Sequence, residues 1–319
     1  MDRDVLVAGE TLIDFIPDRP GPLDDIASFE RRPGGAPANV AVALARLERP
    51  PLFWTRVGDD PFGRYLERRL VEYGLTDRWI ERDEGAKTTL AFVTHDETGD
   101  RAFSFYRDGT ADTRLESGRI DDDTLADCNW VHAGGVTLSS GSSRAATLDL
   151  LARAASAGCT VSFDPNLRPE LWPDEGAFAG VAADALENVD VCLATVEELE
   201  ALGVAGATPT AIARAAIDRW PLHTVFVTRG SDGAVAVSSA DAPWPAAAVD
   251  HSGFEIDVID TTGAGDAFVA GAIDALRSGR ELGASVAFAN AVGATATTES
   301  GAMTALPTRE AVATVLEEE

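Results

Sequence analysis

The stretch Asp260-Thr261-Thr262-Gly263-Ala264-Gly265-Asp266 runs directly into Ala267-Phe268-Val269-Ala270-Gly271-Ala272-Ile273. The apolar residues at 256–259 that precede it predict a strand ending at Asp260. Beyond Gly263 the apolar side chains recur with the helical period, which predicts a helix over 264–278. The centre of this stretch is therefore a glycine-containing turn between a strand and the N-terminus of a helix.

Such a turn can bind an anion. Gly263 and Gly265 allow a tight bend, so that backbone N–H groups of Gly263, Ala264 and Gly265 can point into one small space at the positive end of the helix. Asp266 falls in the first helical turn. A carboxylate beside a bound phosphate suits a base that deprotonates an attacking hydroxyl. An aspartate here could instead only cap the helix, and the short G-x-G-D pattern leaves both interpretations open.

Two other kinds of phosphate loop are excluded. Phe268 stands where a dinucleotide-binding fingerprint has its third glycine, so Gly263 and Gly265 do not begin such a motif. No G-x-x-x-x-G-K-[ST] sequence occurs, and Lys87 is the only lysine of the chain. A Walker-type ATPase is therefore excluded.

Residues 260–268, D-T-T-G-A-G-D-A-F, closely resemble the C-terminal signature of the ribokinase (PfkB) family of carbohydrate kinases. Residues 33–41, P-G-G-A-P-A-N-V-A, are similar to its N-terminal signature, and the resemblance covers essentially the whole chain. It implies an ATP- and Mg²⁺-dependent sugar kinase, with Asp266 as the catalytic base and Gly263, Ala264 and Gly265 as the anion hole.

Composition restricts the partners and the compartment. The 319 residues include 53 acidic and 26 basic side chains, a net charge of −27. This charge repels nucleic acids and anionic membranes, so we expect neither as a partner. No run of 18 apolar residues and no basic-then-apolar leader occurs, and three separated cysteines suit a reducing compartment, so we expect a cytoplasmic protein.

The acidity also suggests a habitat. Dense carboxylates stay hydrated in molar salt, where their mutual repulsion is screened. We therefore expect a protein of a salt-accumulating halophile. A codon bias towards arginine, combined with an ordinary acidic protein, is the alternative.

Alternating strand and helix patterns predict a doubly wound, mostly parallel α/β sheet flanked by helices. Helical patterns lie at 142–157, 176–187, 208–219, 264–278 and 282–298, and strand patterns at 160–163, 189–193, 224–228 and 234–238. Residues 96–100 predict a hairpin turn between two β-rich runs. We expect one domain over 1–319, with the family's small β-lid formed by about 12–32 and 88–110, and a homodimer that forms through this lid.

The resemblance also assigns residues to the sugar side. Asp14 falls at the junction of core strand and lid, and Gly34, Gly35 and Asn39 follow in the N-terminal signature. Residues 103–112 are similar to the F-Y-R-x-x-S-A-D stretch of the fructokinase branch. Asp164, Asn166 and Arg168 match a D-P-N-x-R segment near the transferred phosphoryl group, where Arg168 could stabilise charge or form a structural ion pair. The implied sugar contacts are Asp14, Gly34, Gly35, Asn39, Tyr106, Arg107, Asp164, Asn166 and Asp266.

The nucleotide and metal residues follow in the same way. Thr228, Gly230 and Gly233 match a T-x-G-x-x-G nucleotide turn, although these glycines also suit an ordinary hairpin. With Gly263, Gly265 and Asn290 they are the implied ATP contacts. Glu198 matches the acid that organises Mg²⁺ through water, but Thr195 stands where the family usually has asparagine. Asp260, Thr262, Ala296 and Gly301 correspond to a loop that holds a monovalent cation, which implies K⁺.

We expect fructose as the acceptor, because of residues 106–112 and the G-E-x-L-I-D-F opening. The alternatives are 2-keto-3-deoxygluconate, whose carboxylate Arg107 could bind, and a nucleoside. A non-catalytic sugar or nucleotide sensor would keep the glycine turn but lose the base, so the presence of Asp266 argues against it.

Overall fold

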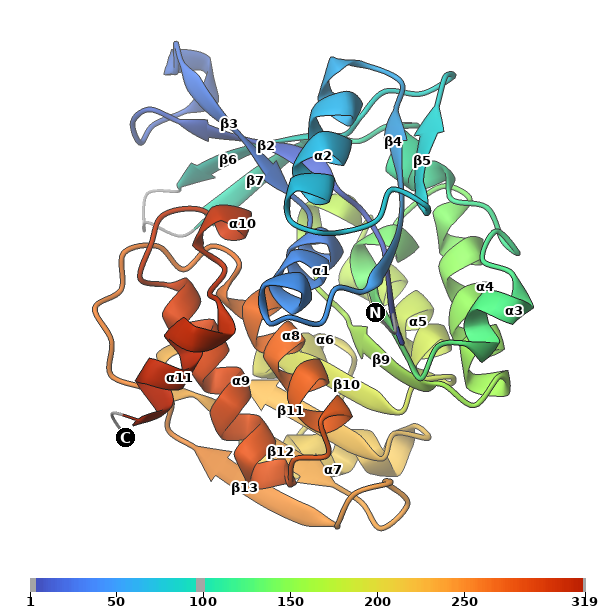
Figure 1. Cartoon of the computed structure of the whole chain (residues 1–319), viewed down its shortest axis with the longest axis vertical. Helices are drawn as coiled ribbons and strands as arrows, with labels where there is room; N and C mark the ends of the chain where they lie inside the picture. The colour runs from blue at the N-terminus through green and yellow to red at the C-terminus, as the bar shows by residue number, and fades with distance from the viewer. Residues whose placement is uncertain (1–3, 96–100, 318–319) are drawn as a thin grey trace.

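The structure is a computed structural model that describes residues 4–95 and 101–317. Within these residues nine strands form one sheet, in the order β13-β12-β11-β10-β9-β8-β1-β4-β5 (Figure 1). Their bounds are β1 Val5–Ala8, β4 Leu52–Gly58, β5 Ile80–Asp83, β8 Trp130–Gly134, β9 Thr160–Asp164, β10 Val191–Thr195, β11 Thr224–Thr228, β12 Ala234–Ser238 and β13 Ala247–His251. Neighbours from β5 to β11 pair in parallel, whereas β12 and β13 are antiparallel at one edge. The predicted mostly parallel sheet is confirmed.

Successive side chains of each strand point to opposite faces, and both faces are covered by helices. Val5 and Val7 of β1 belong to one apolar core, while Leu6 and Ala8 belong to the other. The helices on the first core are α1 Ala36–Arg46, α2 Pro61–Glu72, α8 Ala264–Arg277, α9 Leu282–Ala296, α10 Ala302–Ala305 and α11 Arg309–Glu317. Those on the second are α3 Asp122–Ala126, α4 Ser143–Ser156, α5 Glu175–Leu186, α6 Val196–Ala201 and α7 Pro209–Arg219.

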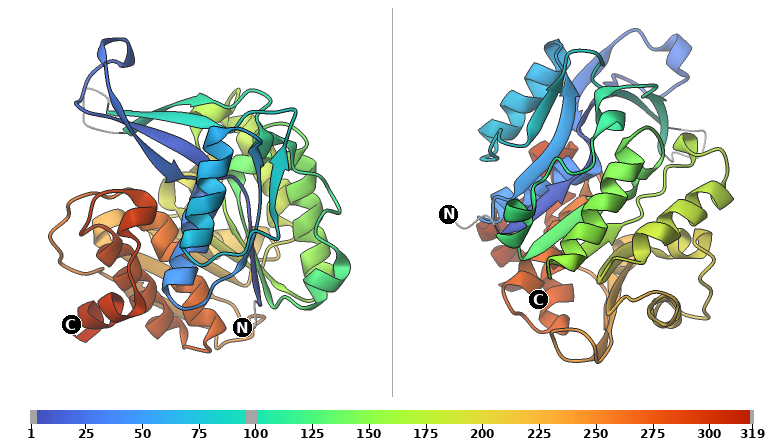
Figure 2. Two further views of the ribbon diagram at one scale, coloured as in Figure 1. Left: turned by 45° about the horizontal axis from the view of Figure 1, so that its top comes forward. Right: turned by 90° about the vertical axis from the view of Figure 1, so that its right-hand side faces the viewer.

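A second, four-stranded sheet lies at one end of the molecule (Figures 1 and 2). We call this sheet the lid. Its order is β3-β2-β6-β7, with bounds β3 Phe29–Gly34, β2 Leu12–Pro17, β6 Leu90–His95 and β7 Arg101–Tyr106. The sheet is mixed, because β2 and β6 are parallel and the outer pairs are antiparallel. Two separate segments of the chain contribute its strands.

The expected helices and strands after residue 140 occur as α4, α5, α7, α8, α9, β9, β10, β11 and β12. The strand expected at 256–259 does not form. Val258 and Ile259 are exposed in a loop, and the N–H groups of Ile259 and Asp260 donate to the carbonyl of Thr297 instead of a strand. Strand β13 was not predicted, because its alternate positions are alanine or exposed polar residues. The turn expected at 96–100 lies outside the described residues.

In the described parts of the chain, no helix is both long and apolar enough to cross a membrane. Cys128, Cys159 and Cys192 are all buried and free, as expected for small core residues. The glycine turn after β4 has a structural role: the Asp60 carboxylate caps α2 by accepting from the N–H groups of Phe62 and Gly63 and also from that of Thr88.

Candidate active site

A cavity of about 420 Å³ lies between the lid and the carboxyl ends of β1, β9, β10 and β11. Ligands of open α/β sheets bind at this edge, because the loops that follow parallel strands converge there. Many of the residues predicted from the sequence line this cavity. They are Asp14, Gly35, Asn39, Asp164, Asn166, Arg168, Glu198, Thr228, Thr262, Gly263, Gly265 and Asp266.

Asp266 lies in the first turn of α8 and lines the cavity. One of its oxygens, Oδ2, accepts a hydrogen bond of 2.7 Å from Nδ2 of Asn39, in the first turn of α1. Burial raises the pKa of Asp266 to about 6, while the Asn39 amide and the Arg168 charge act in the opposite direction. A carboxylate with this pKa is ionised at neutral pH and still able to accept a proton.

Gly263 provides the predicted turn into α8, whereas Gly265 already lies in the first turn of that helix and the described residues 256–259 before the turn form no strand. Gly263 is the N-cap of α8 with φ 78°, a conformation that glycine adopts without strain. A Cβ added to Gly263 would press on Ala302, whereas one added to Gly265 would meet nothing within 4 Å. Gly265 is therefore not required by packing of the chain itself, and the space beside it opens to the cavity. Ala264 begins the helix between them and does not line the cavity.

The loop after β9 contributes a third group. Asp164 accepts from the N–H of Asn166 at 2.9 Å, and Asn166 has φ 44°. Burial, together with the charges of Glu198 and Asp266, raises the pKa of Asp164 well above its usual range. Arg168 makes no ion pair with a described residue, and its guanidinium lies 5.6 Å from the centre of the Phe103 ring. Its positive charge is thus available to the cavity.

Glu198 has its carboxylate occupied by backbone groups. Oε2 accepts from the N–H of Thr195 and Oε1 from that of Leu167, both at 2.9 Å. Thr195 in return accepts from the N–H of Glu198, which completes a capping box at the start of α6. Thr195 therefore has a structural role of its own, where the family pattern has asparagine, and Glu198 ties α6 to the loop after β9.

On the lid side, Asp14 of β2 lines the cavity beside the N-terminus of α1. Gly34 is buried against it, because an added Cβ would collide with the Asp14 carboxylate. Gly35 is the N-cap of α1 with φ 106°, and a side chain there would collide with the carbonyl of Glu10. Gly34 thus acts by leaving room for Asp14 and is not itself on the cavity wall.

Tyr106, one of the expected sugar contacts, does not line the cavity. Phe103 and Phe105 of β7 line the cavity, and the alternation of the strand directs Tyr106 to the opposite face of the lid. Tyr106 is 64% exposed there, and its ring packs edge-on against Phe92 with centroids 5.4 Å apart. Phe105 is the aromatic residue of this stretch that faces the site.

Arg107, another of the expected sugar contacts, lies behind the cavity wall in a buried ion pair with Asp112. Nε of Arg107 donates to Oδ2 of Asp112 at 2.6 Å, and both side chains are almost completely buried. Neither residue lines the cavity. Nε of Arg107 is thus paired with Asp112 behind the wall, while Nη2 of Arg107 is buried without a hydrogen-bond partner among the described residues.

Only some of the residues expected to contact ATP line the cavity. Thr228 lines the cavity, whereas Gly230 and Gly233 form the turn of the β11–β12 hairpin and Asn290 is buried within α9, all three outside the cavity wall. A side chain at Gly233 would collide with the backbone at 251–253. Packing within the hairpin is therefore sufficient to explain why a glycine occupies position 233.

The four residues expected around a monovalent cation lie near one another. Asp260 Oδ1 accepts from the N–H of Thr262 at 2.9 Å and Oδ2 from that of Gly301 at 2.9 Å, which joins the two loops. Ala296 ends α9, next to Thr297, whose carbonyl accepts from the Asp260 N–H. Asp260, Thr262 and Gly301 line a second cavity of about 360 Å³ under the lid.

Comparison with known proteins agrees with this arrangement. The model of the pfkB family carbohydrate kinases matches residues 2–309. The chain belongs to this family. The kinase is 35% identical over 311 residues to the fructokinase of Vibrio alginolyticus, covering 96% of each chain, and 34% identical over 317 residues to that of Escherichia coli, covering 97% of this chain and 98% of the relative.

Solved structures show the same fold. A fructokinase of Xylella fastidiosa with bound ATP superposes with a TM-score of 0.86 at 33% identity, covering 100% of the kinase and 99% of that chain. A double mutant of the Vibrio cholerae fructokinase, with fructose, ADP and potassium ion bound, gives 0.83 at 33% identity, with 99% of each chain covered. The ribokinase-like fold with its mixed-sheet lid is thereby established, and the chain is a carbohydrate kinase.

The cavity of the kinase also contains residues that the sequence did not single out. Glu10 follows β1 and lines the wall together with Leu12 and Phe105 from the lid. Val136 follows β8, and Leu193 lies within β10. The position of Glu10 immediately after a buried strand was a usable signal, because loops at carboxyl ends of parallel strands form binding sites.

Proposed function

We propose that the kinase transfers the γ-phosphate of ATP to a hydroxyl of fructose. The relatives named above support this substrate by their similarity over nearly the whole chain. The observation that carries the chemistry is Asp266, which lines the cavity one residue beyond the glycine turn and is oriented by Asn39. The attacking hydroxyl lies against Asp266, and its proton passes to the Asp266 carboxylate as the new O–P bond forms and the bond from the γ-phosphorus to the bridging oxygen of ATP breaks, with ADP leaving.

The charge of the transferred group is stabilised from two sides. The N-terminus of α8 presents the backbone N–H groups of Gly263 and Gly265, with open space beside Gly265, whereas the N–H of Ala264 donates to the carbonyl of Thr261. Arg168 approaches from the loop after β9. Catalysis in this arrangement is positioning combined with electrostatic stabilisation in a site that excludes water.

Mg²⁺ fits the oxygen-rich wall between β9 and β10. Within the described residues no three His, Cys, Asp or Glu side chains gather to hold a metal directly, and both Glu198 oxygens already accept backbone hydrogen bonds. Glu198 and Asp164 would therefore hold the ion through water, with the nucleotide phosphates completing its shell. The bound ion supplies positive charge that offsets the phosphates.

K⁺ fits the loop pair at Asp260, Thr262 and Gly301. The Asp260 carboxylate fixes both loops, and its position next to the glycine turn couples the shape of the loops to that of the anion hole. Backbone carbonyls and the Asp260 carboxylate are the hard oxygen ligands that such an ion prefers. We propose that the ion orders this turn.

The charge of the cavity favours a neutral sugar. Its wall includes five carboxyl groups, from Glu10, Asp14, Asp164, Glu198 and Asp266, but only one guanidinium, from Arg168. The carboxylate of 2-keto-3-deoxygluconate would meet like charges in a partly desolvated site, a costly contact. The argument for the acid sugar depended on Arg107, which is paired with Asp112 outside the cavity wall.

A coupled assay of ADP release, run over a panel of sugars under one salt condition, tests the proposed substrate. We expect kcat/KM for fructose to exceed that for 2-keto-3-deoxygluconate at least tenfold, which corresponds to about 1.4 kcal/mol of transition-state stabilisation. A nucleoside such as adenosine should react more slowly still. A higher kcat/KM for the acid sugar or the nucleoside would overturn the assignment.

We also propose a homodimer that forms through the lid. The face of the lid opposite the cavity includes Phe15, Phe29, Phe92 and the exposed Tyr106, with Phe15 and Phe92 stacked at 4.9 Å. Exposed aromatic groups of this kind favour protein contacts. Sedimentation equilibrium of the wild type and of Tyr106→Arg distinguishes the states: we expect a dimer for the wild type and dissociation for the variant. A monomeric wild type would contradict the proposal.

A further inference from the structure

Glu10 is a buried acid that no step of the proposed mechanism uses. It follows β1, is 2% exposed, and nevertheless lines the cavity. Its Oε1 accepts a hydrogen bond of 3.2 Å from the N–H of Ala36, at the start of α1. Its Oε2 is buried and has no hydrogen-bond partner among the described residues. Because Glu10 lines the cavity, this unpartnered oxygen can form a hydrogen bond with a molecule bound there.

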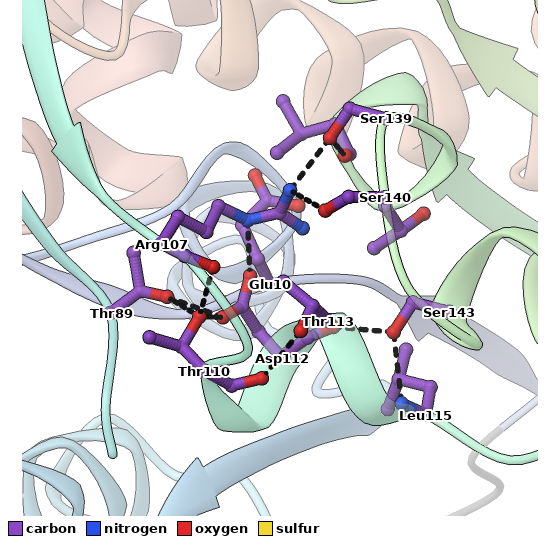
Figure 3. A network of polar contacts seen from close by, with 12 residues as sticks. Glu10, Thr89, Arg107, Thr110, Asp112, Thr113, Leu115, Ser139, Ser140 and Ser143 are labelled. Atoms are coloured by element: carbon purple, nitrogen blue, oxygen red, sulfur yellow. Dashed lines mark hydrogen bonds and ion pairs between the residues drawn. The ribbon is translucent and has the colours of Figure 1, made fainter. Parts of the chain in front are cut away.

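A charged network lies beside Glu10 (Figure 3). Arg107 donates from Nε to Asp112 at 2.6 Å and from Nη1 to Oγ of Ser139 at 2.6 Å. The other oxygen of Asp112 accepts from the hydroxyl groups of Thr110 and Thr89. Asp112 offsets part of the attraction that Arg107 exerts on an ionised Glu10, and Nη2 of Arg107 is buried without a hydrogen-bond partner among the described residues.

The chemistry of Glu10 follows from this placement. Burial raises the pKa of Glu10 to about 7, and the Asp112 charge acts in the same direction, while the Arg107 charge opposes both. In its protonated form the Glu10 carboxyl can donate one hydrogen bond and accept another, which is what a sugar hydroxyl requires. In its ionised form it can only accept, and it repels an anionic sugar.

We propose that Glu10 is a specificity residue of the sugar site, which binds a hydroxyl of the acceptor as a neutral carboxylic acid. This inference rests on the proposed sugar-kinase site and adds the recognition of a neutral sugar to it. Among the described residues, the charged groups that act on Glu10 are Arg107 at the end of β7 and Asp112 in the turn Ala111–Arg114, while α1 offers it only a backbone N–H. Across the cavity the titratable groups are Asp14, Asp164, Glu198 and Asp266.

The test compares Glu10→Gln and Glu10→Ala with the wild type, each assayed with fructose at pH 6.5 and 8.5. Glutamine keeps an acceptor for the Ala36 N–H and an N–H donor for the sugar, but does not titrate. Thr55→Val is the matched control, because Thr55 is fully buried with an unpartnered hydroxyl and does not line the cavity. It reports the effect of disturbing a buried polar group elsewhere.

We expect KM of the wild type to rise on the order of tenfold between pH 6.5 and 8.5, as the competent protonated fraction falls. KM of Glu10→Gln should stay within about threefold over this range, and Glu10→Ala should raise KM at pH 6.5 about tenfold with kcat reduced less than threefold. Thr55→Val should follow the wild type.

Two results overturn the inference: a KM for Glu10→Ala within twofold of the wild type at pH 6.5, or the same rise of KM with pH in Glu10→Gln as in the wild type. If Glu10→Ala does not fold, Glu10→Gln alone decides, because it retains the structural hydrogen bond. If wild-type enzyme does not phosphorylate fructose, the proposed substrate fails, and the same KM comparison is made with the neutral sugar that the panel identifies.

Discussion

Replacement of Asp266 by asparagine tests the proposed mechanism most directly. The amide has the shape of the carboxyl group and can still accept the hydrogen bond that Asn39 donates at 2.7 Å, so the wall of the cavity should remain intact. Only the proton acceptor is lost. General-base catalysis contributes about 10²–10⁴ to the rate, and kcat should therefore fall by about this factor while ATP binding is retained.

The pH dependence gives a second expectation. Burial raises the pKa of Asp266 to about 6, and the base must be ionised to accept a proton. In the wild type kcat/KM should therefore rise as pH increases through about 6, and this limb should be absent from Asp266→Asn. Asn39→Ala removes a hydrogen bond that stabilises the ionised form, so its ascending limb should move to higher pH.

Asp266→Asn should also stabilise the folded protein. A carboxyl whose pKa changes from an ordinary 3.8 to about 6 on folding opposes folding once it is ionised, by on the order of 2–3 kcal/mol. This cost is absent below about pH 4, where the group is protonated in both states, and is fully present above about pH 6. Asp266→Asn should therefore raise the unfolding midpoint at pH 7.5 but not at pH 3.5 or below.

The assay is ADP release with fructose from pH 5 to 9, combined with calorimetric unfolding without ligands. Asp149→Asn on α4, outside the cavity, serves as a control for loss of one carboxylate. If Asp266→Asn turns over within tenfold of the wild type, or keeps the ascending limb near pH 6, Asp266 is not the base. In that case its role is the hydrogen bond from Asn39 that joins α8 to α1.

Four further outcomes are expected. Phe105→Ala should raise KM for the sugar about tenfold, whereas Tyr106→Ala should leave it within twofold, and the reverse order would contradict the faces assigned to β7. Thr195→Val should lower the free energy of unfolding by about 1 kcal/mol, whereas Thr195→Asn should leave it unchanged, because both threonine and asparagine can cap α6. Urea titration measures both values, and an equal loss in the two variants would argue against the cap. The unfolding midpoint should rise steeply between 0.1 and 3 M KCl, since the net charge of −27 is screened, and a flat profile would mean that the acidic surface is incidental. Rates in KCl should exceed those in equimolar tetramethylammonium chloride if an ion binds at Asp260, and equal rates would remove that site.

The sequence predicted the layered core and the position of the glycine turn for identifiable reasons. Parallel strands covered on both faces produce continuous apolar runs, as in β10 and β11, and the intervening helices end at Gly158 and Gly203 with positive φ. Gly263 likewise adopts the left-handed conformation that only glycine takes freely. Where the local backbone conformation requires a particular residue type, such as glycine at a positive φ, the sequence alone locates the end of the helix or the turn.

The sequence failed where tertiary contacts decide. Val258 and Ile259 have the pattern of a strand, but no neighbouring strand is present to pair with them, and they remain exposed in a loop. Arg107 was assigned to the sugar because of its motif, and the ion pair with Asp112 that buries it depends on a turn five residues later. Tyr106 and Phe105 are neighbours in one motif, and only the pairing of β7 with β6 determines which of them faces the cavity.

The titration behaviour of the cavity separates the roles of its acids. Burial raises the pKa of Glu10, Asp164 and Asp266 alike, so burial alone does not distinguish them. Asp266 differs because the Asn39 amide and the Arg168 charge both stabilise its ionised form, which holds its pKa at about 6. Asp164 faces two further carboxylates, Glu198 and Asp266, which raise its pKa further. At pH 7.5 Asp266 is consequently the ionised base, whereas Asp164 holds its proton more strongly than an ordinary carboxyl group and Glu10 is poised between its two forms, and groups whose environments separate their pKa values in this way can perform different tasks in one site.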